Sequence, residues 1–297
     1  MIQSSQPSPL APRRLEVFDT VLREIVWETH DTVTLVLDPG EHHRNYTAGQ
    51  FVSIDPGQFR ELKQQIAYFE KAKGKREPVR AYSMASTPDE PHLAITVKEE
   101  EFLEDSTEFP PLLSPLLVHG LEVGRKITVK GYSGFYHLPP DVMEQTGHVV
   151  HVTAGSGVVP NFAMVKWALR HLPDLRHTFV YSNKTWADTI FARQLTEMEQ
   201  GSGGRLRVLH CLTREPSVPA ESPCARLGRI NTELLADAIP DPESCLVFAC
   251  GPAITRWDKK AARARGEEPK PRFLETVKEL LAERGVPRQR LHTEAYG

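Results

Sequence analysis

Cysteine is scarce in this chain of 297 residues, and the spacing of its cysteines does not suit a metal. The four cysteines are Cys211, Cys224, Cys245 and Cys250, and no two of them form a CxxC pair or a CxxxxCxxC run. Zinc ribbons and plant-type iron–sulfur clusters take their thiolates from such spacings, so we predict no metal site. We expect reduced thiols, as in an intracellular protein.

Long apolar runs and an excess of one charge are also missing. No stretch approaches the roughly 20 uninterrupted apolar residues that span a bilayer, and residues 1–14 lack the apolar core of a secretory signal. The 36 basic and 39 acidic residues give a formal net charge of −3, which argues against an all-basic nucleic-acid binder. The sequence predicts a cytoplasmic protein with no membrane partner and no nucleic-acid partner.

Three stretches of the chain differ in pattern. Residues 1–14 are polar and rich in proline, which predicts a flexible tail. Residues 15–143 hold short alternating apolar runs broken by glycine and proline, which predict an antiparallel β-barrel or sandwich. Residues 144–297 alternate apolar strands with helical patterns, which predicts a parallel, doubly wound α/β sheet. Two domains suit a chain of this length.

Two basic segments look like insertions. Residues 58–75 space apolar side chains on one helical face among lysines and arginines, and residues 256–272 are rich in cations. Both segments have two interpretations. They form solvated faces, or they form a basic platform that attracts an acidic redox partner by electrostatic steering.

The first motif with chemistry lies in a predicted strand, in the run RAYSMAS at residues 80–86. Arg80 suits a bidentate contact with a phosphate, while Tyr82 offers a planar face and Ser83 a hydroxyl to a flat heterocycle. An ion pair at a sheet edge beside a packed aromatic ring is the alternative interpretation.

The second motif follows a predicted strand and opens a helix, at residues 152–162. Gly155 and Gly157 let the backbone approach a pyrophosphate, and the helix N-terminus supplies free N–H groups. Pro160 suits the first helical turn, where its missing N–H is no loss. The motif is not the GxGxxG fingerprint, and a purely structural turn is the alternative.

A third motif, CGP at residues 250–252, stands at the carboxyl end of a predicted strand, where ligands of open α/β sheets bind. A buried structural cysteine is the alternative. The strand that ends at Tyr181 is followed by Ser182, Asn183 and Lys184, with no acidic residue where a ribose diol is usually bound. Ser182 and Lys184 suit a 2′-phosphate, which favours NADPH over NADH, although Lys184 also suits an ordinary exposed loop.

In this order, the motifs make the chain resemble the ferredoxin-NADP reductase family from about residue 15 to its last residue. The resemblance implies a six-stranded antiparallel FAD-binding β-barrel over residues 15–143 and a Rossmann-like NAD(P)-binding α/β domain over residues 144–297. It implies a flavoprotein oxidoreductase that passes hydride from NAD(P)H to FAD and single electrons to a ferredoxin. The chain has no cysteines spaced to bind an iron–sulfur cluster of its own. The acceptor is therefore expected to be a separate ferredoxin, iron–sulfur protein or oxygenase component.

The resemblance also implies roles for individual residues. Ser83, Cys250, Glu294 and Tyr296 would be catalytic, with Cys250 beside the nicotinamide C4 and Tyr296 covering the flavin face. The residues implied for FAD are Arg80, Ala81, Tyr82, Ser83, Val97, Ser114 and Tyr296. The residues implied for NAD(P) are Thr153, Gly155, Ser156, Gly157, Pro160, Ser182, Asn183, Lys184, Cys250, Gly251 and Pro252.

The chain departs from the family's pattern in two places. Residues 99–105, EEEFLED, stand where the family has a glycine-rich turn, and Ser114 is the candidate for the serine that follows it. Tyr296 is followed by Gly297, so its ring is not at the terminus itself. Two other functions stay open: a flavin reductase that releases reduced flavin, and a non-catalytic flavin-binding electron-transfer or redox-sensing subunit.

Overall fold

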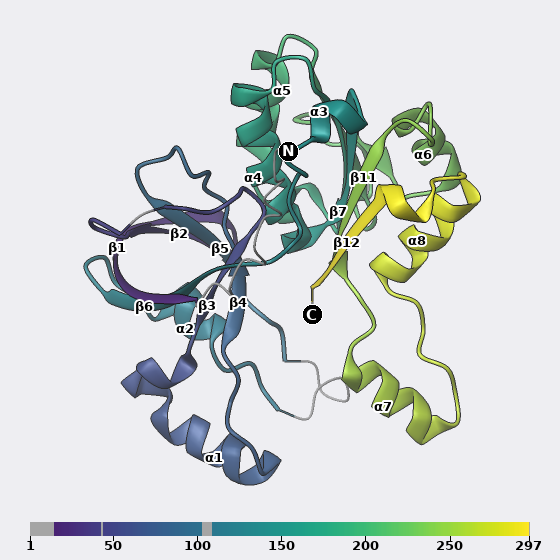
Figure 1. Cartoon of the computed structure of the whole chain (residues 1–297). Coiled ribbons are helices and arrows are strands. Elements are labelled where there is room, and N and C mark those ends of the chain that lie inside the picture. The colour runs from purple at the N-terminus through teal and green to yellow at the C-terminus, as the bar shows by residue number, and fades with distance from the viewer. Residues whose placement is uncertain (1–14, 43, 103–108, 297) are drawn as a thin grey trace, which may run out of the picture.

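Two six-stranded sheets lie side by side in the computed structural model, which describes residues 15–42, 44–102 and 109–296 (Figure 1). The tail predicted at residues 1–14 lies outside the described residues, as does part of the acidic segment at 99–105. Figure 1 shows the first sheet on the left and the second on the right, with the end of the chain between them. Within the described residues, no helix is both long and apolar enough to cross a membrane.

The first sheet is antiparallel and curls into a barrel-like shape. Its strands, in the order β4-β3-β6-β1-β2-β5, are β1 (Glu16–Thr29), β2 (Thr32–Asp38), β3 (Phe51–Ile54), β4 (Arg80–Ser83), β5 (Leu93–Lys98) and β6 (Lys126–Ser133). The two edges meet at an isolated bridge between Met84 and Ile95 and at a hydrogen bond from the Ala85 N–H to the Ala94 carbonyl, without a continuous ladder, so the barrel is not fully closed. Every second side chain of a strand lies on the same face of the sheet. Val33, Leu35 and Leu37 of β2 are fully buried on one such face and form part of the core.

Helices α1 (Lys63–Lys73) and α2 (Ser114–His119) accompany this sheet, with 3₁₀ turns η1 (Pro56–Gln58) and η2 (Arg60–Leu62) before α1. The helical face predicted for residues 58–75 is therefore only partly correct. Phe59, which lies between the two turns, and Leu62, which ends η2, precede the helix and are buried, whereas Phe69 is buried from α1 itself.

The second sheet is parallel throughout. Its strands, in the order β10-β9-β8-β7-β11-β12, are β7 (His148–Ala154), β8 (Arg176–Asn183), β9 (Leu206–Leu212), β10 (Arg226–Leu227), β11 (Leu246–Pro252) and β12 (Leu291–Tyr296). Strand β7 has β8 on one side and β11 on the other, so the direction of winding reverses between β7 and β11. Such a switch point leaves a crevice at the carboxyl ends of the strands.

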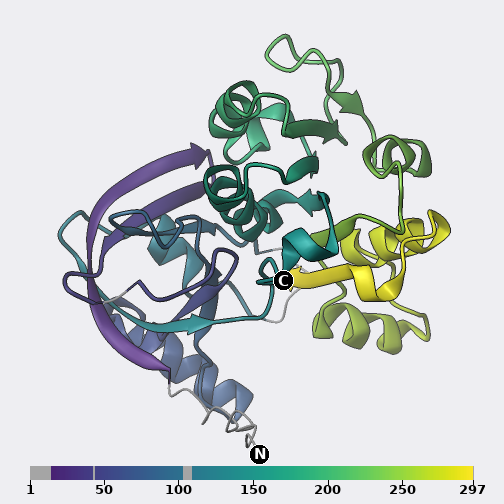
Figure 2. The same cartoon turned by 45° about the horizontal axis from the view of Figure 1, so that its top comes forward.

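Helices cover both faces of the second sheet (Figures 1 and 2). The helices of this part of the chain are α3 (Val142–Gln145), α4 (Val158–His171), α5 (Ala192–Gly201), α6 (Thr232–Ala238), α7 (Arg256–Arg265) and α8 (Phe273–Glu283), with 3₁₀ turns η3 (Gly155–Gly157), η4 (Trp186–Asp188) and η5 (Arg288–Arg290). Helix α7 lies away from the sheet, at the end of the molecule where α1 lies (Figure 1). Helices α4 and α5 share one apolar cluster with the sheet, and α6 and α8 share another. The observed alternation of strand and helix confirms the predicted two-part fold.

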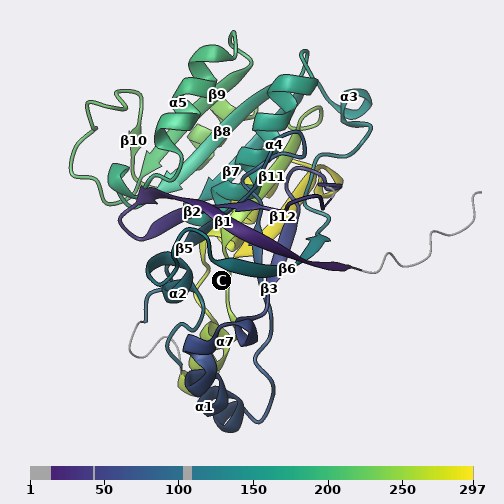
Figure 3. The same cartoon turned by 90° about the vertical axis from the view of Figure 1, so that its left-hand side faces the viewer.

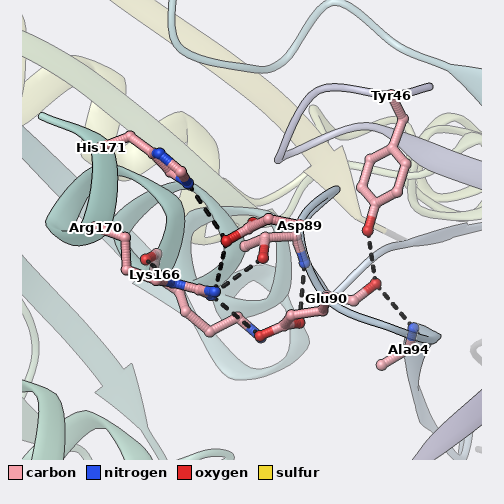
Figure 4. Close-up of polar contacts among 9 residues, drawn as sticks. Tyr46, Asp89, Glu90, Ala94, Lys166, Arg170 and His171 are labelled. Carbon is pink, nitrogen blue, oxygen red and sulfur yellow. Dashed lines mark hydrogen bonds and ion pairs between the residues drawn. The ribbon is translucent and has the colours of Figure 1, made fainter. Parts of the chain in front are cut away.

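The two sheets are joined through α4 by a cluster of charged side chains (Figure 4). Lys166 Nζ lies 2.9 Å from Glu90 Oε2, and Arg170 contacts both Glu90 and Asp89, at 3.1 and 2.7 Å. His171 Nε2 lies 3.3 Å from the same Asp89 carboxylate. The carboxylates belong to the turn between β4 and β5, so these ion pairs connect the first sheet to the second.

Candidate functional site

The carboxyl ends of β7, β11 and β12 form the edge of the second sheet that meets the first. Cys250 of β11 is in register with Thr153 of β7 on one side and with Glu294 of β12 on the other. Parallel pairing thus aligns three residues that are far apart in the sequence. Both Thr153 Oγ1 and Glu294 Oε2 are buried and make no hydrogen bond with any described residue. Buried polar atoms normally have partners, so this edge is suited to a polar ligand.

Strand β12 also reaches the first sheet. The Tyr296 hydroxyl donates a hydrogen bond to Ser83 Oγ of β4 at 2.5 Å, although the two residues are 213 positions apart. The sheet register places Tyr296 beside Pro252. The four residues that the resemblance implies as catalytic therefore lie around the junction of the sheets, with Ser83 on β4 of the first sheet and Cys250, Glu294 and Tyr296 on β11 and β12 of the second.

The environment of this junction favours neutral side chains. Cys250 is fully buried, and burial together with the nearby Glu294 raises the pKa of its thiol well above the ordinary value. Burial also raises the pKa of Glu294 to about 7. Cys250 is therefore a thiol and not a thiolate at neutral pH, and Glu294 is able to hold or release a proton there.

The raised pKa of Glu294 predicts a specific loss of stability with increasing pH. Its folded value of about 7 exceeds the ordinary 4.5, so the folded state binds the extra proton between these limits. The stabilisation is fully present below about pH 4.5 and is lost as the pH rises through about 7. Over this range we expect wild type to lose about 3 kcal/mol relative to Glu294→Gln, measured by urea unfolding. Parallel pH profiles for the two proteins would contradict the assignment.

The turn between β7 and α4 uses its two glycines for different reasons. Gly155 has a φ of +52°, and a Cβ added there would meet nothing within 4 Å, so its outer face is open to a ligand. At Gly157 the same Cβ would lie 2.4 Å from the carbonyl oxygen of Cys250. Ser156 lies between them in η3, and Pro160 occupies the first turn of α4, where it costs no hydrogen bond.

A buried hydrogen-bond network that the sequence motifs do not include supports this turn. Asn161 Nδ2 donates to the Gly157 carbonyl at 3.2 Å, and Asn161 Oδ1 accepts from the Tyr136 hydroxyl at 3.2 Å. His151 Nδ1 lies 2.9 Å from the same oxygen, and burial lowers the pKa of His151 to about 4, which keeps its ring neutral. The sequence did carry a sign of this network, which is Asn161 in the otherwise apolar start of a predicted helix. A polar side chain in such a place needs buried hydrogen-bond partners.

Residues predicted to contact FAD occupy β4 and its neighbours. Arg80 donates to the Pro78 carbonyl at 2.7 Å and to Glu77 Oε2 at 3.1 Å, and thus makes the ion pair that was the alternative interpretation. Tyr82 packs partly buried against the core of the first sheet, whereas Ala81 is exposed. Val97 is 1% exposed within that core.

Ser114 begins α2, and its hydroxyl accepts a hydrogen bond from the backbone N–H of Glu100 at 3.1 Å. Its side chain therefore ties the segment after β5 to the helix. Ser114 is 4% exposed.

At the end of β8 the structure adds a cation that the sequence patterns did not indicate. Ser182 and Asn183 are buried, while Lys184 is half-exposed, with its Nζ 3.8 Å from Glu101 Oε1. The backbone N–H of Arg214 donates to the Lys184 carbonyl at 2.7 Å, which brings a second exposed cation to the same edge. Arg214 follows β9, and only the pairing of β8 with β9 places it there.

Gly251 and Pro252 continue the edge after Cys250. A Cβ at Gly251 would lie 2.6 Å from the Phe273 ring, so glycine permits α8 to pack close to β11. Pro252 is exposed at the end of the strand. Among the described residues, no group of three or more His, Cys, Asp or Glu side chains is placed to hold a metal ion.

Comparison with known proteins agrees with this architecture. Residues 152–256 match the family described as "Oxidoreductase NAD-binding domain". The chain is 25% identical to flavohemoprotein A of Dictyostelium discoideum over 92% of its own length and 58% of that protein. It is 27% identical to NADH-cytochrome b5 reductase 1 of Kluyveromyces lactis over 44% of this chain and 45% of that protein. The chain thus spans about half the length of these curated relatives.

Among solved structures, the chain is similar to the FAD/NAD-binding domain of nitric oxide dioxygenase from Vibrio cholerae O1 biovar El Tor. The TM-score is 0.69 at 20% identity, and the likeness covers 94% of this chain and 98% of that domain. The predicted resemblance is confirmed for the fold of both sheets and for the NAD-binding part.

Proposed function

Because the chain has the fold of the ferredoxin reductase-like FAD/NAD-binding reductases, we propose that it is an FAD-dependent NAD(P)H oxidoreductase. Residues 15–143 would bind FAD and residues 144–297 would bind the nicotinamide coenzyme. Electrons would leave one at a time to a separate ferredoxin or similar iron–sulfur protein. The observation that carries the proposal is the junction where Ser83 and Tyr296 meet beside the unpartnered Thr153 and Glu294.

The residues at the junction fit both groups. Arg80 offers N–H donors to a pyrophosphate, and Tyr82 offers a ring to a flat heterocycle. The open turn at Gly155, at the N-terminus of α4, suits the second pyrophosphate. FAD, when bound, supplies the chemistry that accepts a hydride and releases single electrons. Tyr296 would cover the flavin face and move aside for nicotinamide.

Two side chains at the junction would orient the coenzyme. Thr153 and Glu294 flank Cys250 and offer the polar atoms that a carboxamide needs. Cys250 lies between them as a neutral thiol, so it places no negative charge beside the coenzyme. A small displacement of such groups costs on the order of a hundredfold in rate.

We propose NADPH as the coenzyme, with NADH as the alternative. Lys184 and Arg214 place two exposed cations at the carboxyl edge of β8 and β9, where the adenosine ribose of a doubly wound fold lies. Ser182 adds a hydroxyl, and Asn183 Nδ2 is buried without a hydrogen bond to any described residue. A 2′-phosphate would accept charge-assisted hydrogen bonds from this set.

The double substitution Lys184→Ala and Arg214→Ala is expected to raise the KM for NADPH by about a hundredfold or more, because it removes two charged hydrogen bonds, each worth about 1.5–3 kcal/mol. The KM for NADH should stay within about twofold of wild type in steady-state assays, since NADH lacks the phosphate. Lys278→Ala, an exposed lysine of α8, is the matched control. Equal losses for both coenzymes would contradict the phosphate assignment.

The basic helices favour an acidic acceptor. Figures 1 and 3 place α1 and α7 at the same end of the molecule, and Lys71, Lys75, Lys259 and Arg263 are all exposed there. Positive patches steer acidic partners at low ionic strength. Transfer to a ferredoxin that slows with added salt, and further with charge reversal at Lys71 and Lys75, would support this interface.

The function is tested by anaerobic stopped-flow mixing of the FAD-loaded protein with NADPH or NADH, and then with a ferredoxin or with cytochrome b5. Bleaching of the flavin bands supports the reductase, and the faster acceptor identifies its class. A protein that does not retain FAD contradicts the proposal and favours a flavin reductase. Retained FAD that neither nucleotide bleaches favours a non-catalytic subunit.

A further inference from the structure

Glu77 is a buried carboxylate just before β4. Its side chain is 2% exposed, although residues 76–79 belong to no helix or strand. An ionised carboxylate is costly to bury unless cations and hydrogen bonds surround it. Glu77 therefore needs a reason for its position, and its partners supply one.

The two carboxylate oxygens of Glu77 bind cations from different parts of the chain. Oε1 accepts from Lys73 Nζ at 2.5 Å, at the end of α1, and Oε2 accepts from Arg80 Nη2 at 3.1 Å, at the start of β4. The backbone N–H of Glu77 donates to Glu70 Oε1 of α1 at 3.0 Å. The inserted helix is thus tied to Arg80, the first residue of β4, through one side chain.

Lys73 is itself held firmly. Its side chain is 14% exposed, and Nζ lies 4.4 Å from the ring centroid of Phe69 and 4.6 Å from that of Phe109. The negative ring faces favour a cation at this point. Burial raises the pKa of Glu77, but the hydrogen bonds from Lys73 and Arg80 outweigh it and hold the pKa below its ordinary value. The three groups therefore carry one negative and two positive charges.

This charge count matters for Arg80. Glu77 is shared between Lys73 and Arg80, so the carboxylate orients the guanidinium without fully cancelling its positive charge. The bonds to Glu77 and to the Pro78 carbonyl use two of the five N–H donors of Arg80, and its side chain is 32% exposed. A planar guanidinium fixed in this way loses less freedom when it binds an anion.

We propose that Glu77 and Lys73 are positioning residues that fix Arg80 for a pyrophosphate, so that the inserted helix α1 is part of the flavin-binding site. The inference rests on the proposed function, because the pyrophosphate is that of FAD. It assigns a role to residues 58–75 that neither a solvated face nor a partner platform provides.

The test is the affinity of the apo-protein for FAD, followed by quenching of flavin fluorescence. Glu77→Gln should raise the Kd about tenfold, because Arg80 loses the carboxylate that orients it. Lys73→Met should raise the Kd by a similar factor, because the Glu77 carboxylate then pairs with Arg80 alone and offsets its positive charge. In an Arg80→Met background, Glu77→Gln should have no further effect, since the guanidinium it positions is gone. Lys71→Met, an exposed lysine of α1, is the matched control and should leave the Kd unchanged.

The outcomes separate the two proposals. A merely structural role of Glu77 would lower FAD affinity by the same factor with and without Arg80, and that result overturns the inference. Apo-protein melting temperatures check the fold, and Lys73→Met replaces Glu77→Gln where the latter does not fold. Wild type that binds no FAD contradicts the proposed function itself. Wild type that binds FAD, with both variants unaffected, contradicts only the positioning role.

Discussion

Asn161→Ala is expected to lower the free energy of unfolding by about 4 kcal/mol, because it removes hydrogen bonds from three buried groups. These are the Gly157 carbonyl, the Tyr136 hydroxyl and the neutral His151 ring, all of which now bond to the one carboxamide. Asn161 and His151 are fully buried, so the freed groups lie away from the protein surface. Urea unfolding followed by circular dichroism measures the change.

Asn231→Ala provides the control for this loss. Asn231 is exposed at the N-cap of α6, where its side chain accepts from the Leu234 N–H at 2.9 Å, and removing such a cap costs about 1 kcal/mol. If Asn161→Ala lowers the free energy of unfolding by no more than Asn231→Ala does, the buried network contributes little to stability.

Gly157→Ala is the substitution with the second large expected effect, about 3 kcal/mol of stability. The added Cβ would lie 2.4 Å from the Cys250 carbonyl oxygen and 2.8 Å from the Gly251 Cα, and both are backbone atoms. The turn or β11 must therefore shift, and either movement disturbs the edge between Thr153 and Glu294. We expect a lower melting temperature together with weaker coenzyme binding.

Gly155→Ala separates packing from ligand binding. At Gly155 the new methyl group meets no atom within 4 Å, so the cost is the positive φ alone, about 1 kcal/mol. The methyl group would occupy the open face that we assign to the coenzyme. The substitution should therefore reduce the free energy of NADPH binding by more than it reduces the free energy of unfolding. Greater destabilisation by Gly155→Ala than by Gly157→Ala, in calorimetric melting, would refute this view of the turn.

Local pattern predicted an antiparallel barrel or sandwich followed by a parallel α/β sheet, and the family resemblance added the six-stranded barrel. Alternating residues such as Val33, Leu35 and Leu37 identify antiparallel strands, and the glycines after β7 identify a strand-to-helix turn. The start of α1 was less predictable, because Phe59 and Leu62 have helical spacing but lie before the helix, in a segment of two short 3₁₀ turns. Spacing alone cannot distinguish a buried turn from a buried helix face.

The parts of the site that depend on strand pairing were beyond sequence patterns. Arg214 reaches Lys184 only because β9 pairs with β8, and Tyr136 reaches Asn161 only because α4 packs beside the connection between the sheets. The ion pair of Arg80 with Glu77 is different. It is local in sequence, yet a glutamate three residues before an arginine does not reveal that it is buried.

Helix α4 is anchored along its whole length. Its first residues adjoin the glycine turn, Asn161 bonds to Tyr136, and its last turns hold Lys166 and Arg170 against Glu90 of the other sheet. A helix held at both ends in this manner acts as a spacer. Its length sets how far the glycine turn stands from the turn between β4 and β5 of the first sheet.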